Sequence, residues 1–154
     1  MAGIKFDNSL IVHIEGEGLT TEDVERTLAA RLEELGYAKE TFTAAILERE
    51  AVFPTALDMD GINVAIPHCD VANVNEAAVC MGVLENPVAW HRMDDPENTC
   101  EVSLVCMLAL TEPHAHLEML QKVIGLVQNQ ELVAKVVASD SIDEVFELVH
   151  DQLV

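Results

Sequence analysis

The segment Val-Ser-Leu-Val-Cys-Met-Leu-Ala-Leu, residues 102–110, decides the fold class of this chain of 154 residues. All but one of its side chains are apolar, which is typical of a strand that is covered on both faces of a sheet. The next residues, Thr111, Glu112 and Pro113, follow the order of cap, acid and early proline that opens a helix. A buried strand that leads into a helix indicates an α/β architecture.

Shorter patterns on both sides of this segment extend the same architecture. Apolar or alternating runs predict further strands, at residues 10–14, 62–66 and 77–84, with a short one at 88–90 inside a turn-rich stretch at 87–98. Caps and apolar stripes at helical spacing predict helices, at residues 21–35, 39–50, 111–127, 131–138 and 141–149. We therefore expect one domain over residues 1–154, an α/β three-layer sandwich with a mixed sheet of about five strands and helices on both faces.

The helix predicted at residues 39–50 has a charged side chain in an unexpected place. Its apolar stripe contains Phe42, Ala45 and Ile46, and Arg49 falls on the same stripe, seven residues after Phe42. One interpretation is an arginine at the edge of the stripe whose head group reaches water. The other is an inward-facing arginine with a role in a functional site.

The charge of the chain excludes several classes of partner. With 28 acidic and 8 basic residues the formal net charge is −20, which repels phosphate backbones and anionic membranes. The few lysines and arginines are scattered along the chain and form no basic patch. Half of the residues are hydrophobic, so the chain is not a disordered acidic segment. We expect no nucleic-acid binding and no membrane insertion, and any charged partner should be a basic protein.

The N-terminus and the cysteines indicate where the protein works. Residues 1–10 lack a cationic region followed by an apolar one, so we expect no signal peptide. The longest apolar stretches, about ten residues, are too short to span a bilayer. Cys69, Cys80, Cys100 and Cys106 show no disulfide spacing and are interpreted as reduced thiols. These features predict a cytoplasmic protein, and no long apolar stripe demands a partner, so we expect a monomer.

Two histidines stand out by their position. The alternating strand at 62–66 ends at Pro67, because proline has no backbone donor for the sheet. His68 is therefore the first side chain presented beyond a strand end. His116 lies in the first turn of the helix that follows residues 102–110.

The apolar pattern of that helix predicts which of its histidines faces inward. Its predicted buried stripe consists of Leu117, Leu120, Ile124 and Val127. His116 lies four residues before Leu120 and continues this stripe. His114 is expected to face solvent, because side chains two residues apart on a helix point in different directions.

Several chemistries fit these residue types. The chain has no GxGxxG, Walker A, GxSxG, HExxH or CxxC motif. His68, Cys69 and His116 are legitimate zinc ligands, although no pair of them has ligand spacing. A Cys69 nucleophile with a histidine base is a second alternative, but little in so acidic a chain lowers the pKa of a thiol. A binding or structural domain with incidental histidines is a third.

A phosphoryl carrier needs fewer parts than these alternatives. A neutral imidazole is nucleophilic at cytoplasmic pH and can accept a phosphoryl group directly. The group also needs donors that bind its oxygens as charge develops. Arg49 and His116 are suitable donors, and the N-terminus of a helix adds its dipole. His68, His116 and Arg49 are thus the candidate site residues, provided that the fold brings them together.

The segment Gly-Ile-Asn-Val-Ala-Ile-Pro-His, residues 61–68, resembles the signature of IIA components of the bacterial sugar phosphotransferase system, fructose–mannitol superfamily. The resemblance covers nearly the whole chain and includes LERE with Arg49, the strand at 102–110 and HLEML with His116. Cys69 after the histidine, with LALTEPHAHLEML and GLVQNQEL, is most similar to the galactitol-type branch. Mannitol- and fructose-type members usually have glycine after the histidine.

The resemblance implies a phosphohistidine relay in sugar transport. His68 would accept the phosphoryl group from phospho-HPr, on Nε2 in this family, and pass it to a cysteine of the cognate IIB protein. IIB would then phosphorylate a polyol such as galactitol as it enters through the IIC membrane component. By family analogy His116 hydrogen-bonds the phosphoryl group and Arg49 stabilises its charge. No metal or organic cofactor is implied, and the family fold is a mixed five-stranded sheet with helices on both faces.

A regulatory IIA-like protein is the alternative within this family. In that case the phosphorylation state would control another protein without feeding any sugar uptake. The alternative resembles the nitrogen-related IIA branch.

Overall fold

The structure is a computed structural model that describes residues 4–153, with the backbone alone for residues 113–116. Its sheet has five strands in the order β1-β4-β5-β3-β2. The pairs β1–β4 and β3–β5 are parallel, and the pairs β4–β5 and β2–β3 are antiparallel. This confirms the predicted mixed five-stranded sheet. The strands are β1 Ile11–Ile14, β2 Ala56–Leu57, β3 Asn63–Ala65, β4 Ala78–His91 and β5 Thr99–Ala109.

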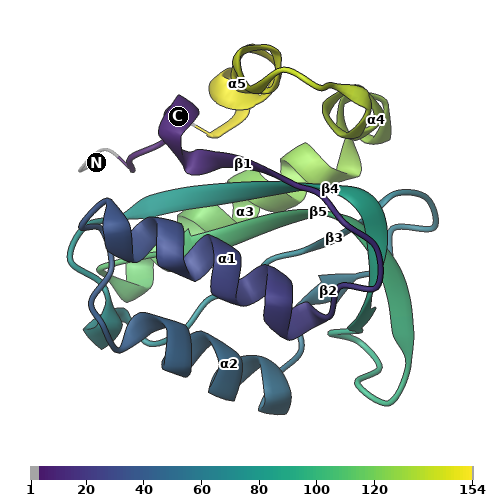
Figure 1. Ribbon diagram of the computed structural model, residues 1–154. Helices are drawn as coiled ribbons and strands as arrows, with labels where there is room; N and C mark the ends of the chain where they lie inside the picture. The colour runs from purple at the N-terminus through teal and green to yellow at the C-terminus, as the bar shows by residue number, and fades with distance from the viewer. Residues whose placement is uncertain (1–3, 154) are drawn as a thin grey trace.

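Five α-helices enclose the sheet in a three-layer arrangement (Figure 1). Two of them, α1 and α2, pack against one another below the sheet, and α1 contacts β4 and β5. The other three pack together, and α4 and α5 lie on the opposite side of the sheet. The helices are α1 Thr21–Glu34, α2 Phe42–Val52, α3 Pro113–Gln128, α4 Gln130–Ala138 and α5 Ile142–Leu153; short 3-10 turns are η1 Asn8–Leu10 and η2 Val71–Asn73.

Local sequence signals explain α1 well. Thr20 caps its first turn and exchanges hydrogen bonds with Asp23, which forms a complete capping box. Gly36 ends the helix with a φ of +82°, a conformation that L-amino acids with side chains rarely adopt. Between these ends, the apolar pattern predicts a stripe of four residues, of which Val24, Leu28 and Leu32 are fully buried, whereas Leu35 at the C-cap is 39% exposed.

β4 corrects the interpretation of the stretch at residues 87–98. Residues 87–91 belong to the same long strand as residues 78–86, so they are not part of a separate turn-rich excursion. The register shifts between two pairs, Val83 with Leu104 and Val88 with Val102, which leaves four residues opposite one. A bulge of this kind accommodates Pro87, which has no backbone donor for the ladder.

The predicted buried stripe of α3 was wrong for two of its four members, and a third, Leu120, packs against the core but is only partly buried. Leu117 is 63% exposed, Ile124 is 38% exposed and Leu120 is half-buried. The residues that reach the core are Met119, Val123, Leu126 and Val127. Because apolar residues occupy two neighbouring stripes of this helix, periodicity alone could not decide which stripe faces the sheet.

Candidate functional site

His68 is held at the end of β3 by backbone hydrogen bonds. The Ile66 N–H donates to the Thr55 carbonyl at 3.2 Å, and the Pro67 carbonyl accepts from the Leu108 N–H at 2.9 Å. The ring nitrogen Nδ1 of His68 lies 2.9 Å from the Ile66 carbonyl oxygen. A carbonyl only accepts, so Nδ1 carries the proton and the neutral ring has its lone pair on Nε2.

The surroundings of His68 keep its imidazole neutral. The side chain is half-buried, and burial is the largest cause that lowers its pKa. The hydrogen bond to Ile66 opposes this, the positive charge of Arg49 lowers the pKa further, and the negative charge of Glu50 raises it. The net pKa lies below the ordinary value of 6.5, so the neutral, nucleophilic form dominates at neutral pH.

Arg49 and His68 line the same cavity, which has a volume of about 340 Å³. Arg49 comes from the C-terminal half of α2, and its guanidinium carbon lies 5.2 Å from the centroid of the Phe53 ring. The structure therefore brings these two predicted residues together. The rest of the cavity wall is mainly apolar, formed by Phe53, Pro54, Thr55, Leu57, Ile66, Met93, Leu120 and Ile124.

The inward-facing interpretation of Arg49 was wrong. Its side chain is exposed, and the charged residue on the buried stripe of α2 is its neighbour Glu50. Phe42, Ile46 and Glu50 follow one another at intervals of four and are the buried residues of this helix. Sequence reasoning missed Glu50, although its position eight residues after Phe42 was the available signal.

His116 lies in the first turn of α3, and its side chain is outside the described residues. The same helix contributes Leu120 and Ile124 to the wall of the cavity. The role of His116 at the site therefore stays a prediction. The side chain of His114 is outside the described residues as well.

The thiol beside His68 is poorly suited to nucleophilic chemistry. Cys69 is buried, and burial raises the pKa of its thiol to about 11. The thiolate is therefore scarce at neutral pH.

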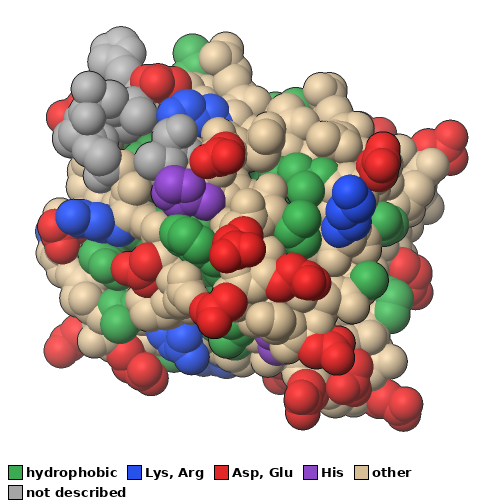
Figure 2. Space-filling view, turned by 90° about the horizontal axis from the view of Figure 1, so that it is seen from above, with side chains coloured by type: hydrophobic (Ala, Val, Ile, Leu, Met, Phe, Trp, Pro, Cys, Tyr) green, Lys and Arg blue, Asp and Glu red, His purple; other side chains and the backbone are tan. Residues whose placement is uncertain are grey.

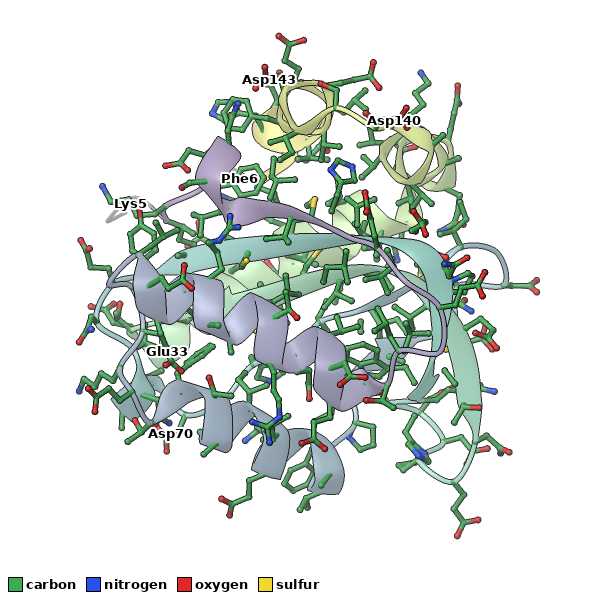
Figure 3. All side chains as sticks on the ribbon, viewed as in Figure 1. Lys5, Phe6, Glu33, Asp70, Asp140 and Asp143 are labelled. Carbon is green, nitrogen blue, oxygen red and sulfur yellow. The ribbon has the colours of Figure 1, made fainter. Side chains whose placement is uncertain are left out.

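The next residue, Asp70, lies on the side of the molecule that α2 occupies, and its carboxylate accepts from the Ala72 N–H (Figure 3).

Metal ligation finds no support in the described part of the chain. Among the side chains that the structure describes, no three histidines, cysteines or carboxylates gather so that they could hold a metal ion.

In the same part of the chain, no helix combines the length and the apolar character that crossing a membrane requires.

An apolar rim surrounds the cavity beside His68. Phe53 is 61% exposed, and Met93 and Ile124, which line the same cavity, are exposed as well. Large apolar side chains exposed together mark surfaces that contact other molecules. The site therefore combines a neutral imidazole, a cationic side chain and a surface on which another protein can dock.

A known family model matches almost the whole chain. The model described as "Phosphoenolpyruvate-dependent sugar phosphotransferase system, EIIA 2" covers residues 5–152. Among curated relatives, the galactitol-specific EIIA component from Escherichia coli (strain K12) is 32% identical over 98 residues, 64% of this chain and 65% of that protein. This chain thus spans just under two thirds of the length of that relative.

Solved structures share the fold. The complex of enzyme IIAMTL and phosphorylated enzyme IIBMTL from Escherichia coli gives a TM-score of 0.78 at 21% identity, over 96% of this chain and 99% of that one. The nitrogen regulatory protein IIA-Ntr from Neisseria meningitidis gives a TM-score of 0.71 at 22% identity, over 93% of this chain and 94% of that one.

Proposed function

Because the chain belongs to the EIIA 2 family of the phosphoenolpyruvate-dependent sugar phosphotransferase system, we propose that His68 is its phosphoryl acceptor. One observation carries this assignment. The Ile66 carbonyl holds Nδ1 of His68 in its protonated form, and burial keeps the ring neutral. The nucleophilic lone pair is thereby assigned to Nε2, which we take as the atom that becomes phosphorylated.

The transfer proceeds by two displacements at phosphorus. In the first, the Nε2 lone pair forms a P–N bond while the bond from phosphorus to the donor, phospho-HPr, breaks. In the second, a cysteine thiolate of the cognate IIB protein forms a P–S bond while the P–N bond breaks, and Nε2 recovers its electron pair. Arg49 stabilises the charge on the phosphoryl oxygens, and His116 donates a hydrogen bond to them.

The apolar rim defined by Phe53, Met93 and Ile124 would dock each partner in turn, since both transfers use the same face of the protein. Acidic side chains are spread over the face that carries α4 and α5 (Figure 2). The net charge of −20 on the whole chain favours partners that have basic patches.

The galactitol-specific relative supports a role in sugar uptake. We assign this chain to uptake of a polyol such as galactitol, with IIC as the membrane component reached through IIB. The protein would work in the cytoplasm as a monomer, without a metal or organic cofactor. If it accepts the phosphoryl group but no IIB removes it, the regulatory alternative takes the place of the transport role.

A reconstituted transfer assay tests the proposal. Labelled phosphoenolpyruvate, enzyme I and HPr should label this protein, with a linkage that is stable to base and labile to acid. The label should be absent in His68→Ala. Cys69→Ser is the matched control and should be labelled normally, since it changes the adjacent side chain alone. Persistent label in His68→Ala would refute the assignment of the acceptor.

A further inference from the structure

Glu50 has no part in the transfer described above, yet it begins a hydrogen-bond chain that ends on His68. Its Oε2 accepts from the Thr55 N–H at 2.7 Å, and its Oε1 accepts from the Thr55 hydroxyl at 2.6 Å. The indole nitrogen of Trp90 donates to Oε2 at 3.1 Å. This carboxyl group therefore ties the end of α2 to the residue before β2 and to β4.

From Thr55 the chain continues through the backbone. The Thr55 carbonyl accepts from the Ile66 N–H at 3.2 Å, and the Ile66 carbonyl accepts from Nδ1 of His68 at 2.9 Å. The last acceptor in this chain is the atom that determines the tautomer of His68. A displacement of Thr55 therefore moves the strand end whose carbonyl orients the imidazole.

Glu25 of α1 completes the surroundings of Glu50. The side chain of Glu25 is 1% exposed and its carboxyl group lies close to that of Glu50, while its Oε2 has no hydrogen-bond partner among the residues that the structure describes. Burial, and then the negative charge of Glu50, raise the pKa of Glu25 to about 10. Glu25 therefore keeps its proton at neutral pH and brings no negative charge to the surroundings of Glu50.

We infer that Glu50 is a positioning residue for phosphoryl transfer, which holds Thr55 and, through Ile66, the carbonyl that keeps His68 in its nucleophilic tautomer. The inference rests on the proposed role of His68 as the acceptor. Glu50 acts through its neighbours and does not touch the phosphoryl group. Its buried carboxyl group is satisfied by three donors of the protein, the N–H and the hydroxyl of Thr55 and the indole N–H of Trp90.

Glu50→Gln tests this inference with a side chain of almost the same shape. An amide offers one oxygen in place of two, so its nitrogen meets donors where Glu50 accepts. We expect the rate of transfer from phospho-HPr to fall about tenfold. We also expect less of the Nδ1–H tautomer of His68 in long-range ¹H–¹⁵N spectra. A lower melting temperature with both readouts unchanged would show a purely structural role and overturn the inference.

Thr55→Val provides a milder variant in case Glu50→Gln does not fold. It removes the hydroxyl donor and keeps both backbone links, so we expect a smaller change in the same direction, about twofold in rate. Thr27→Val is the matched control, because the exposed Thr27 hydroxyl donates only within α1, to the Asp23 carbonyl. Equal effects of the two variants on the His68 spectrum would overturn the inference.

The failure of this inference is distinguishable from the failure of the proposed function. If His68→Ala keeps its label, the acceptor assignment fails. The tautomer measurement needs no phosphoryl donor, so it decides the link between Glu50 and His68 in either case.

Discussion

Two buried regions of this molecule differ in their chemistry. At the centre of the sheet, every side chain of β5 from Leu104 to Ala109 is apolar and at most 1% exposed. At the corner where α1, α2 and β2 approach the end of β3, three polar or charged side chains are buried, Glu25, Glu50 and Thr55. In the described part of the chain, Ser139 is the one other buried polar residue.

The difference separates stability from function. Apolar burial in β5 is non-directional and scales with the area removed from water, so it stabilises the fold without selecting the orientation of a ring. Hydrogen bonds at the corner are directional, and a change of one atom redirects them. We therefore expect variants in the apolar core to affect stability more than the rate of transfer. Variants at the corner should affect the rate of transfer more than stability.

Leu104→Ala should produce the largest effect, on stability. Leu104 is fully buried in β5, and its truncation removes apolar contacts and leaves a cavity, which costs about 3 kcal/mol of unfolding free energy. Denaturant unfolding measures this loss. At low temperature the folded variant should accept the phosphoryl group at nearly the original rate. A large loss of transfer in the folded variant would show that the apolar core also sets the geometry of the site.

Arg49→Ala should produce a comparable effect, but on transfer. Removal of a cation beside a developing charge slows such steps by about 100-fold. Because Arg49 is exposed, the melting temperature should hardly change. Arg26→Ala is the matched control, since Arg26 is exposed on α1 and pairs with Glu22. Should Arg49→Ala unfold the protein, or Arg26→Ala slow transfer equally, the role of Arg49 at the site would be refuted.

Glu25→Gln should change how stability depends on pH. The pKa of Glu25 is about 10 in the folded protein against an ordinary value of 4.5, so folding takes up a proton between these values. The stability contributed by Glu25 is fully present below pH 4.5 and is lost as the pH rises towards 10. A neutral glutamine has no such loss, so the variant should gain about 1.4 kcal/mol over the original protein per pH unit in this window.

Unfolding curves of Glu25→Gln at pH 6, 7 and 8 measure this gain. Glu34→Gln is the matched control, because Glu34 is exposed at the end of the same helix, nine residues after Glu25. A constant difference between Glu25→Gln and the original protein across these pH values would mean that Glu25 is ionised in the fold.

The smallest expected effect is on the titration of His68. Burial lowers the pKa of this ring below 6.5, and Arg49 lowers it further. Nuclear magnetic resonance of the imidazole should therefore give a midpoint below 6.5, and Arg49→Ala should move that midpoint upwards. A midpoint at or above 6.5 in the original protein would contradict the neutral imidazole on which the acceptor role depends.

The predictions from sequence were most accurate where structure depends on neighbouring residues. Three of the four stripe residues of α1, its cap at Thr20 and its end at Gly36 were predicted correctly, because capping and helical period act over a few positions. The apolar strand at 102–110 was also confirmed, with small differences at its ends. The fold class followed from these local signals.

Errors occurred where packing chose between equivalent local patterns. α3 has two apolar stripes, and the contacts of the helix decided that Val123, rather than Ile124, reaches the core. On α2 the stripe was followed to Arg49, although the buried charge is Glu50. A helix pattern cannot distinguish these neighbours until the donors that satisfy a buried carboxylate are known.

The sequence by itself determined the α/β class, most of the helices and strands, and the candidate site residues His68 and Arg49. The helical period, the helix caps and the order Ile-Pro-His each depend on residues that are close together in the sequence, so they can be recognised without the tertiary structure. The tertiary structure alone decided that Glu50, Thr55, Ile66 and His68 form one hydrogen-bonded chain. Two of its links join the residue before β2 to the end of β3 and the Ile66 carbonyl to the His68 ring. Each of these links uses at least one backbone atom, which every residue type shares, and so the order of side chains does not reveal it.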